Sequence, residues 1–156
     1  METDRSEKIL SLQLEWVRAA DSKVAPLFAI NIAMLGFLAA LIKLLPIWTI
    51  PSAIISSITV ILLVTSMVFL ALTMFPRLIG PKDSNIFFGG ISKHSEERYL
   101  SDMSSMSDGE YQKDILRQVY RNAEIANSKY ANLRLAFIFA FVSTVPWLVS
   151  VYVLYV

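Results

Sequence analysis

The chain has 156 residues, of which 55% are apolar, and its formal net charge is +1. Soluble domains average roughly 45–50% apolar residues, so the composition indicates a membrane protein. The small net charge excludes a nucleic-acid binder that works by bulk charge. The absence of cysteine excludes disulfides, thiolate nucleophiles and cysteine-based metal sites.

The N-terminal segment, residues 1–23, carries charges of both signs and is predicted to form an amphipathic helix. Its apolar side chains recur every three or four residues, as in the series Ile9, Leu12 and Trp16. The segment lacks the basic start and short apolar core of a signal peptide, so we expect it to be retained. With no breaker before the apolar run that follows, the helix is expected to continue into it, with a kink at Pro26.

Three later runs, residues 24–45, 51–75 and 134–156, are long and apolar enough for transmembrane helices. Small side chains recur along each run, which lets helix backbones approach closely. They fit either compaction of the three helices within one chain or assembly of several copies. The small residues are Ala25, Ala29, Ala33, Gly36 and Ala40, then Ser52, Ser56 and Thr59, then Ala136, Ala140 and Ser143.

The charged residues indicate an orientation. Of 14 lysines and arginines, four precede the first run and nine lie between residues 77 and 134. The positive-inside rule then places the N-terminus and segment 76–133 in the cytoplasm, and the C-terminus outside. The predicted fold class is therefore an all-α integral membrane protein. It has three transmembrane helices and a small cytoplasmic helical bundle continuous with the first and third spans.

Segment 76–133 is predicted to begin with turns and to end in a long helix. Gly89 and Gly90 are among its turn-forming residues, and a short helix is expected over 93–103. Ser107 and Glu110 have the spacing of a capping box, which predicts a helix start near residue 108. That helix is expected to run on through the third span.

No catalytic constellation is recognisable in the sequence. Phosphate-binding loops, dinucleotide-binding glycines, the serine-hydrolase elbow and the zinc-protease motif are all missing, and there is one histidine, His94. We therefore predict that the protein is not an enzyme and has no cofactor and no metal site.

Two polar groups near the first span need partners. Asn31 lies a full turn inside the apolar run, so its amide should meet another helix or an aqueous cavity. It serves either as a helix-to-helix hydrogen bond or in gating. Asp21 can pair with Lys23, Lys129 or Arg134, and Lys23 can alternatively extend to the membrane interface.

A third unusual stretch surrounds Phe88 and Gly89. It is either a turn over a core or a nucleotide site. In the second interpretation an aromatic ring stacks on a base, glycines allow close approach, and Arg77 or Lys82 binds phosphate. Near the third span, Lys129 and Tyr130 are either interfacial anchors or functional residues.

Four stretches together resemble a known family: WVRAADSKVAPLFAIN (16–31), MFPRL with NIFFGGI (74–91), the segment from SEERYL to YANL (95–133) and the apolar last span. The chain resembles the small membrane effectors of bacterial Pycsar antiphage systems. The resemblance implies a protein of the bacterial inner membrane that responds to a cyclic pyrimidine mononucleotide, cyclic UMP or cyclic CMP, made by a partner cyclase. It also implies a response that impairs the membrane and ends in abortive infection.

The resemblance carries over a set of ligand-binding or gating positions. They are Asp21, Lys23, Asn31, Phe88, Gly89, Tyr99, Lys129 and Tyr130. The expected partners are the lipid bilayer, the cyclic nucleotide and further copies of the chain in a homo-oligomer, but no nucleic-acid polymer. A mechanical hypothesis follows, in which ligand binding rotates or tilts the first span and Asn31 exchanges partners or meets water. The alternatives are a scaffold or accessory subunit without a nucleotide ligand, and a small transporter or channel.

Overall fold

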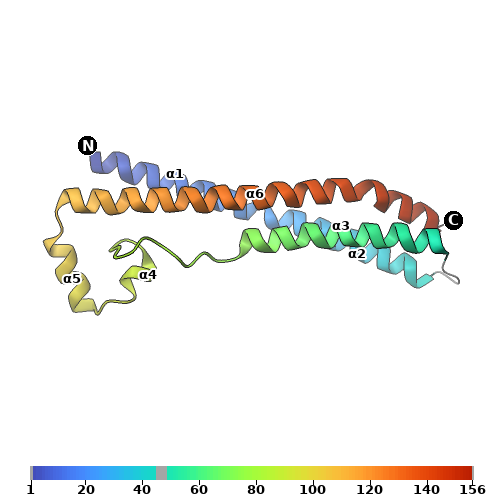
Figure 1. Cartoon of the computed structure of the whole chain (residues 1–156), viewed down its shortest axis with the longest axis horizontal. Coiled ribbons are helices and arrows are strands. Elements are labelled where there is room, and N and C mark those ends of the chain that lie inside the picture. Colours follow the sequence, from blue (N-terminus) through green and yellow to red (C-terminus); the bar gives the residue numbers. More distant parts are fainter. Residues whose placement is uncertain (1, 45–48, 156) are drawn as a thin grey trace. The chain divides into compact units, whose positions relative to one another are not determined.

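The computed structural model describes residues 2–44 and 49–155, and within these ranges every regular element is a helix (Figure 1). Predictions that concern Leu45, Pro46 and most of the loop before the second span, or Val156, lie outside the described residues. The helices are α1 (Glu2–Ser22), α2 (Val24–Leu44), α3 (Ile50–Met74), α4 (Phe88–Ile91), α5 (Glu96–Ser105) and α6 (Asp108–Tyr155).

Three helical runs are long and apolar enough to cross a membrane: Thr3–Lys43, Ile50–Met74 and Asp108–Tyr155. The predicted fold class, all-α with three membrane-spanning helices, is confirmed. The chain forms two compact units. The membrane unit comprises residues 20–44, 49–75 and 129–155, and the extramembrane unit comprises residues 2–19 and 76–128.

The junction of α1 and α2 is interrupted at a single residue. Lys23 lies in a turn, where its backbone N–H donates to the carbonyl of Ala20 at 3.3 Å. Pro26 has no N–H for the carbonyl of Ser22, and its ring crowds that carbonyl, so the helical ladder cannot pass this point unbroken. The chain therefore forms two helices with a one-residue turn between them, where a continuous helix with a kink at Pro26 was expected.

Capping residues fix the start of α3. The hydroxyl of Thr49 accepts from the Ser52 backbone N–H at 3.3 Å, and the Ser52 hydroxyl accepts from the Thr49 N–H at 3.2 Å. Pro51 occupies the first turn, where a missing N–H costs nothing. At the other end α3 stops one residue before the Phe75–Pro76 step, since proline disfavours a helical conformation in the residue before it.

The predicted capping box at the start of α6 is present. Ser107 N–H donates to Glu110 Oε2 at 2.9 Å, and Glu110 N–H donates to the Ser107 hydroxyl at 3.3 Å. These bonds, first the one from the Ser107 backbone, lower the pKa of Glu110 below its ordinary value. From Asp108 the helix continues for 48 residues, through Pro146, to Tyr155.

The segment between α3 and α6 differs from the prediction in two places. The helix expected over 93–103 is α5, three residues later at its start, because the Ser95 hydroxyl accepts from Arg98 N–H and caps it there. The stretch expected as a turn around Gly89 and Gly90 contains the short helix α4. A Cβ on Gly90 would collide with the carbonyl oxygen of Ser84, so a glycine is needed there for close approach.

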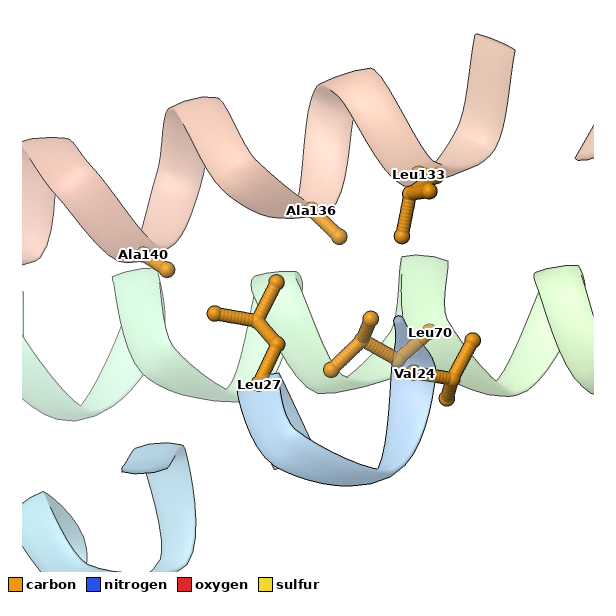
Figure 2. Close-up of a cluster of buried hydrophobic side chains, with 6 residues drawn as sticks. All are labelled: Val24, Leu27, Leu70, Leu133, Ala136 and Ala140. Carbon is orange, nitrogen blue, oxygen red and sulfur yellow. The ribbon is translucent and has the colours of Figure 1, made fainter. Parts of the chain in front are cut away.

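The membrane unit has a compact core where α2, α3 and α6 meet. Figure 2 shows Val24, Leu27, Leu70, Leu133, Ala136 and Ala140 pointing toward one another from the three helices. The small residues predicted for the second and third spans are buried. Those of the first span, from Ala25 to Ala40, are exposed. Compaction within the chain therefore uses the small residues of α3 and α6 and leaves those of α2 outside.

Candidate functional site

An ion pair lies at one end of the membrane unit, where α1 ends. Lys129 Nζ donates to Asp21 Oδ1, and the two side chains are 8% and 34% exposed. Of the three partners considered for Asp21, the structure selects Lys129. A lysine this buried needs a partner, because an isolated ammonium ion is costly to remove from water.

Lys23 and Tyr130 lie next to this pair. The ammonium group of Lys23 lies 5.5 Å from the centroid of the Tyr130 ring, which is within range for a cation–π contact. Four of the predicted site residues, Asp21, Lys23, Lys129 and Tyr130, are therefore brought together. Lys23 itself lies in the turn between α1 and α2.

Asn31 joins the three membrane helices. Its Nδ2 donates to the Ser66 hydroxyl of α3 at 2.8 Å, and that hydroxyl donates to the Ala136 carbonyl of α6 at 2.9 Å. Asn31 and Ser66 are completely buried. The amide thus has the helix-to-helix hydrogen bond that its place in the sequence predicted.

Arg77 lies in the extramembrane unit. Its Nη2 donates to the Ser128 hydroxyl of α6 at 2.8 Å. It is not among the residues that line the cavities described below. The contact ties the start of segment 76–87 to α6.

A cavity of about 520 Å³ surrounds the aromatic–glycine stretch. Phe88 and Gly89 line it together with Lys82, Lys93 and His94. The Phe88 ring is 62% exposed and lies tilted against Phe87, with centroids 4.6 Å apart. Two predicted site residues therefore share a ligand-sized hollow with two lysines.

A second groove, of about 570 Å³, adjoins this cavity and shares Ile79, Gly80 and Pro81 with it. Its α6 side presents three basic residues one turn apart, with two exposed apolar side chains between them. Those five residues are Lys113, Leu116, Arg117, Tyr120 and Arg121. This basic groove was not predicted from the sequence, although the four-residue spacing of its basic residues along a predicted helix was an available signal.

A polar network anchors the loop of residues 84–87 to α6. Gln118 Nε2 donates to the Ser84 hydroxyl at 2.9 Å, and this hydroxyl also accepts from the N–H groups of Ile86 and Phe87. Asp114 Oδ2 accepts from Asn85 N–H at 2.9 Å. Ser84, Asp114 and Gln118 are buried, so the loop is anchored to α6 by its interior and not by surface contacts.

Tyr99 lies half-buried on α5 and lines neither cavity. Its neighbour Tyr111 donates to Glu7 Oε1 at 3.2 Å, which connects α6 with α1. Burial, then the bond to Glu7, raises the pKa of Tyr111. Within residues 2–44 and 49–155 no group of three or more His, Asp or Glu side chains is placed to hold a metal ion.

These features define a three-helix membrane protein with a small helical unit that carries ligand-sized cavities. The chain matches the sequence model of the PycTM family, described as the Pycsar effector protein domain, over residues 5–156, and it belongs to this family. It is 27% identical over 131 residues to the Pycsar effector protein PtPycTM of Propioniciclava tarda. The alignment covers 78% of this chain and 65% of that relative. No solved structure matches the chain significantly.

Proposed function

We propose that the protein is an antiphage effector of the bacterial inner membrane. It responds to a cyclic pyrimidine mononucleotide, cyclic UMP or cyclic CMP, made by a partner cyclase, and it impairs the membrane so that infection is abortive. Membership of the Pycsar effector family over residues 5–156 carries this proposal. Three membrane-spanning helices in a chain with a small extramembrane unit support it.

The proposed ligand site is the basic groove together with the Phe88 cavity beside it. A cyclic mononucleotide carries one singly charged phosphate diester, a ribose and a base. Lys113 and Arg117 provide cations for the phosphate, and Tyr120 or Phe88 provides an aromatic face for the base. A volume of about 570 Å³ suits a ligand of this size.

The proposed topology follows the distribution of basic residues. Residues 1–23 and 76–133 lie in the cytoplasm, and the spans are 24–45, 51–75 and 134–156, with the C-terminus outside. In this orientation the proposed ligand site faces the compartment in which the cyclase makes its product.

The active form is proposed to be a homo-oligomer. The small-residue face of α2, which runs from Ala25 through Gly36 to Ala40, is exposed, and a Cβ on Gly36 would meet nothing within 4 Å. In lipid, helices associate through faces of this kind because small side chains let backbones approach. A second copy of α2 is the partner that fits such a face.

Binding is tested first by thermal unfolding of the detergent-purified protein with cyclic UMP, cyclic CMP, cyclic AMP, cyclic GMP and cyclic dinucleotides. A ligand of the folded state at 100 times its Kd adds about 2.7 kcal/mol. We expect a selective shift with one cyclic pyrimidine mononucleotide. We expect Arg117→Ala to abolish it and Arg98→Ala to keep it, because Arg98 lies on α5 outside both cavities.

Other outcomes are equally informative. A shift that survives Arg117→Ala but is lost with Phe88→Ala moves the phosphate site to Lys82 and Lys93 in the neighbouring cavity. The absence of a shift with any nucleotide contradicts direct sensing and favours a scaffold or accessory subunit without a nucleotide ligand.

A further inference from the structure

The buried face of α3 is rich in hydroxyl groups. Its buried residues follow a regular spacing of four and three positions, which is the seam of a left-handed helix bundle. Five of these seven residues carry a hydroxyl group. The seven are Ser52, Ser56, Thr59, Leu63, Ser66, Leu70 and Thr73.

The neighbouring helices add polar groups to the same interior. Asn31 of α2 bonds to Ser66, and Ser150 of α6 lies 3.2 Å from Thr59, oxygen to oxygen. Ser143 of α6 is also fully buried. The polar seam is the set Asn31, Ser52, Ser56, Thr59, Ser66, Thr73, Ser143 and Ser150.

The seam is as long as a membrane is thick. From Ser52 to Thr73 a helix rises by about 30 Å, which equals the thickness of the hydrocarbon layer. The seam contains no ionisable side chain. It is therefore an uncharged polar row that extends from one face of the membrane to the other.

Most seam hydroxyls bond to carbonyl groups of their own helices, but in the described part of the chain two polar atoms of the seam are left without a partner. Asn31 Oδ1 and Ser56 Oγ are buried and have no hydrogen-bond partner among the residues that the structure describes. A buried polar atom without a partner is unfavourable, and alanine at residue 56 would avoid that penalty in the packed state. The seam thus carries acceptor and donor capacity that the closed bundle does not use.

We propose that the polar seam is the wall of an aqueous pathway for water and small inorganic ions, which opens when the spans separate along it. The proposal rests on the proposed function, in which a nucleotide triggers membrane impairment. When the spans separate, the contacts of Asn31 with Ser66 and of Thr59 with Ser150 break, and the Asn31 amide and the seam hydroxyls hydrate and line the passage. Since the seam carries no fixed charge, the pathway discriminates little between potassium and chloride, and a KCl gradient gives a reversal potential near zero.

The absence of cysteine from the chain makes a direct test possible. Single-cysteine variants are reconstituted in phosphatidylethanolamine–phosphatidylglycerol vesicles and exposed to a charged methanethiosulfonate reagent, with and without cyclic UMP or cyclic CMP. Ser56→Cys lies in the seam, and Ser57→Cys, on the adjacent exposed position, is its control. With the activating nucleotide, the Ser56→Cys reaction should accelerate at least roughly tenfold, because thiolate reactivity requires water access. The modification should also reduce ion flux. Ser57→Cys should stay unreactive, because an exposed position in a membrane span faces lipid and not water.

A second pair of variants keeps side-chain size constant. Thr59→Val should lower nucleotide-triggered ion flux while the nucleotide's thermal shift remains, and Thr65→Val should leave the flux unchanged. Thr65 is the suitable control because its hydroxyl bonds to a carbonyl four residues earlier in α3, as that of Thr59 does, but Thr65 is not part of the buried seam. If the wild-type protein conducts on nucleotide addition but both seam variants behave like their controls, the pathway lies elsewhere and the proposal is wrong. If the wild-type protein never conducts, the proposed function fails first.

Discussion

Both units of the protein bury polar groups and expose apolar side chains, but they do so in different surroundings. The membrane unit buries hydroxyls and an amide and exposes large apolar side chains such as Phe141, which lipid can cover. The extramembrane unit has Ile115 as the single large apolar side chain below 2% exposure among the residues that the structure describes. It nevertheless exposes Ile79 and Tyr120 by 75% and 70%.

The difference teaches that exposure must be interpreted with the solvent in mind. Exposed apolar surface needs no explanation in a bilayer, whereas in water it marks a surface that a ligand or partner covers. Buried hydroxyls are common where membrane helices pack, but Asn31 Oδ1 and Ser56 Oγ, which have no partner among the described residues, are unfavourable in a packed membrane unit. The proposed ligand site of the extramembrane unit and the polar seam of the membrane unit are the two features that differ most from these expectations.

The largest expected effects on stability come from truncating one buried apolar side chain to alanine in each unit. Ile115→Ala should destabilise the extramembrane unit by about 3 kcal/mol, because it removes a transfer term and leaves a cavity. Leu70→Ala should cost roughly half of that, since lipid is as apolar as leucine and mainly packing is lost. Urea titration monitors the first variant and SDS titration the second. An equal or larger cost for Leu70→Ala would mean that the membrane unit gains as much from apolar burial as the extramembrane unit.

The next effect concerns the ion pair at the edge of the membrane unit. Lys129→Met should cost about 1–3 kcal/mol, between the values for exposed and buried pairs, because Asp21 keeps some contact with water. Combining it with Asp21→Asn should cost less than the sum of the single changes. Unfolding of all three variants in one detergent gives the coupling. Strict additivity would show that the pair contributes nothing to stability.

A smaller effect is expected at the junction of the three spans. Ser66→Ala removes the acceptor of Asn31 and the donor to Ala136, and hydrogen bonds between membrane helices contribute about 0.6 kcal/mol on average. Thr65→Ala removes only a bond within α3 and should change stability less. The comparison is made by SDS titration. A larger loss for Thr65→Ala would contradict the assignment of Ser66 as the link between helices.

The smallest effect is a pH dependence at the start of α6. The folded-state pKa of Glu110 is lowered by its bonds from Ser107, so its contribution is present above its unfolded pKa. That contribution is lost as the pH falls through the folded value. Helix content near residue 108, followed by hydrogen exchange, should decline on acidification in the wild-type protein. In Glu110→Gln this decline should be absent, and a decline of equal size would assign the effect to another group.

Much of the architecture was predictable because local chemistry determines it. The lengths of the apolar runs predict the spans, and Ser107 with Glu110 predicts the start of α6. The position of Asn31 predicted either another helix or an aqueous cavity beside its amide, and the structure gives a partner on another helix. The kink was expected at Pro26, whereas the helix breaks at Lys23. The difference arises because a proline disrupts the bond to the carbonyl four residues before it.

The candidate sites were less predictable because they depend on which helix faces meet. Phe88 and Gly89 share a cavity as expected, whereas the basic groove forms only where α6 passes residues 79–81. The seven-residue spacing of Ser52, Thr59, Ser66 and Thr73 is visible in the sequence. A repeat alone does not tell an inward face from a lipid-facing one, and the contacts of Ser66 make that distinction.

The central claim is that a cyclic pyrimidine mononucleotide converts this membrane protein from a closed to a leaky state. Its most direct test is ion and dye release from vesicles that contain the purified full chain, recorded before and after addition of cyclic UMP or cyclic CMP. The account predicts tight vesicles before addition and rapid release with one of these nucleotides, but none with cyclic AMP or cyclic GMP. Release that is constant and independent of any nucleotide, or its complete absence with both pyrimidine nucleotides, would contradict the account.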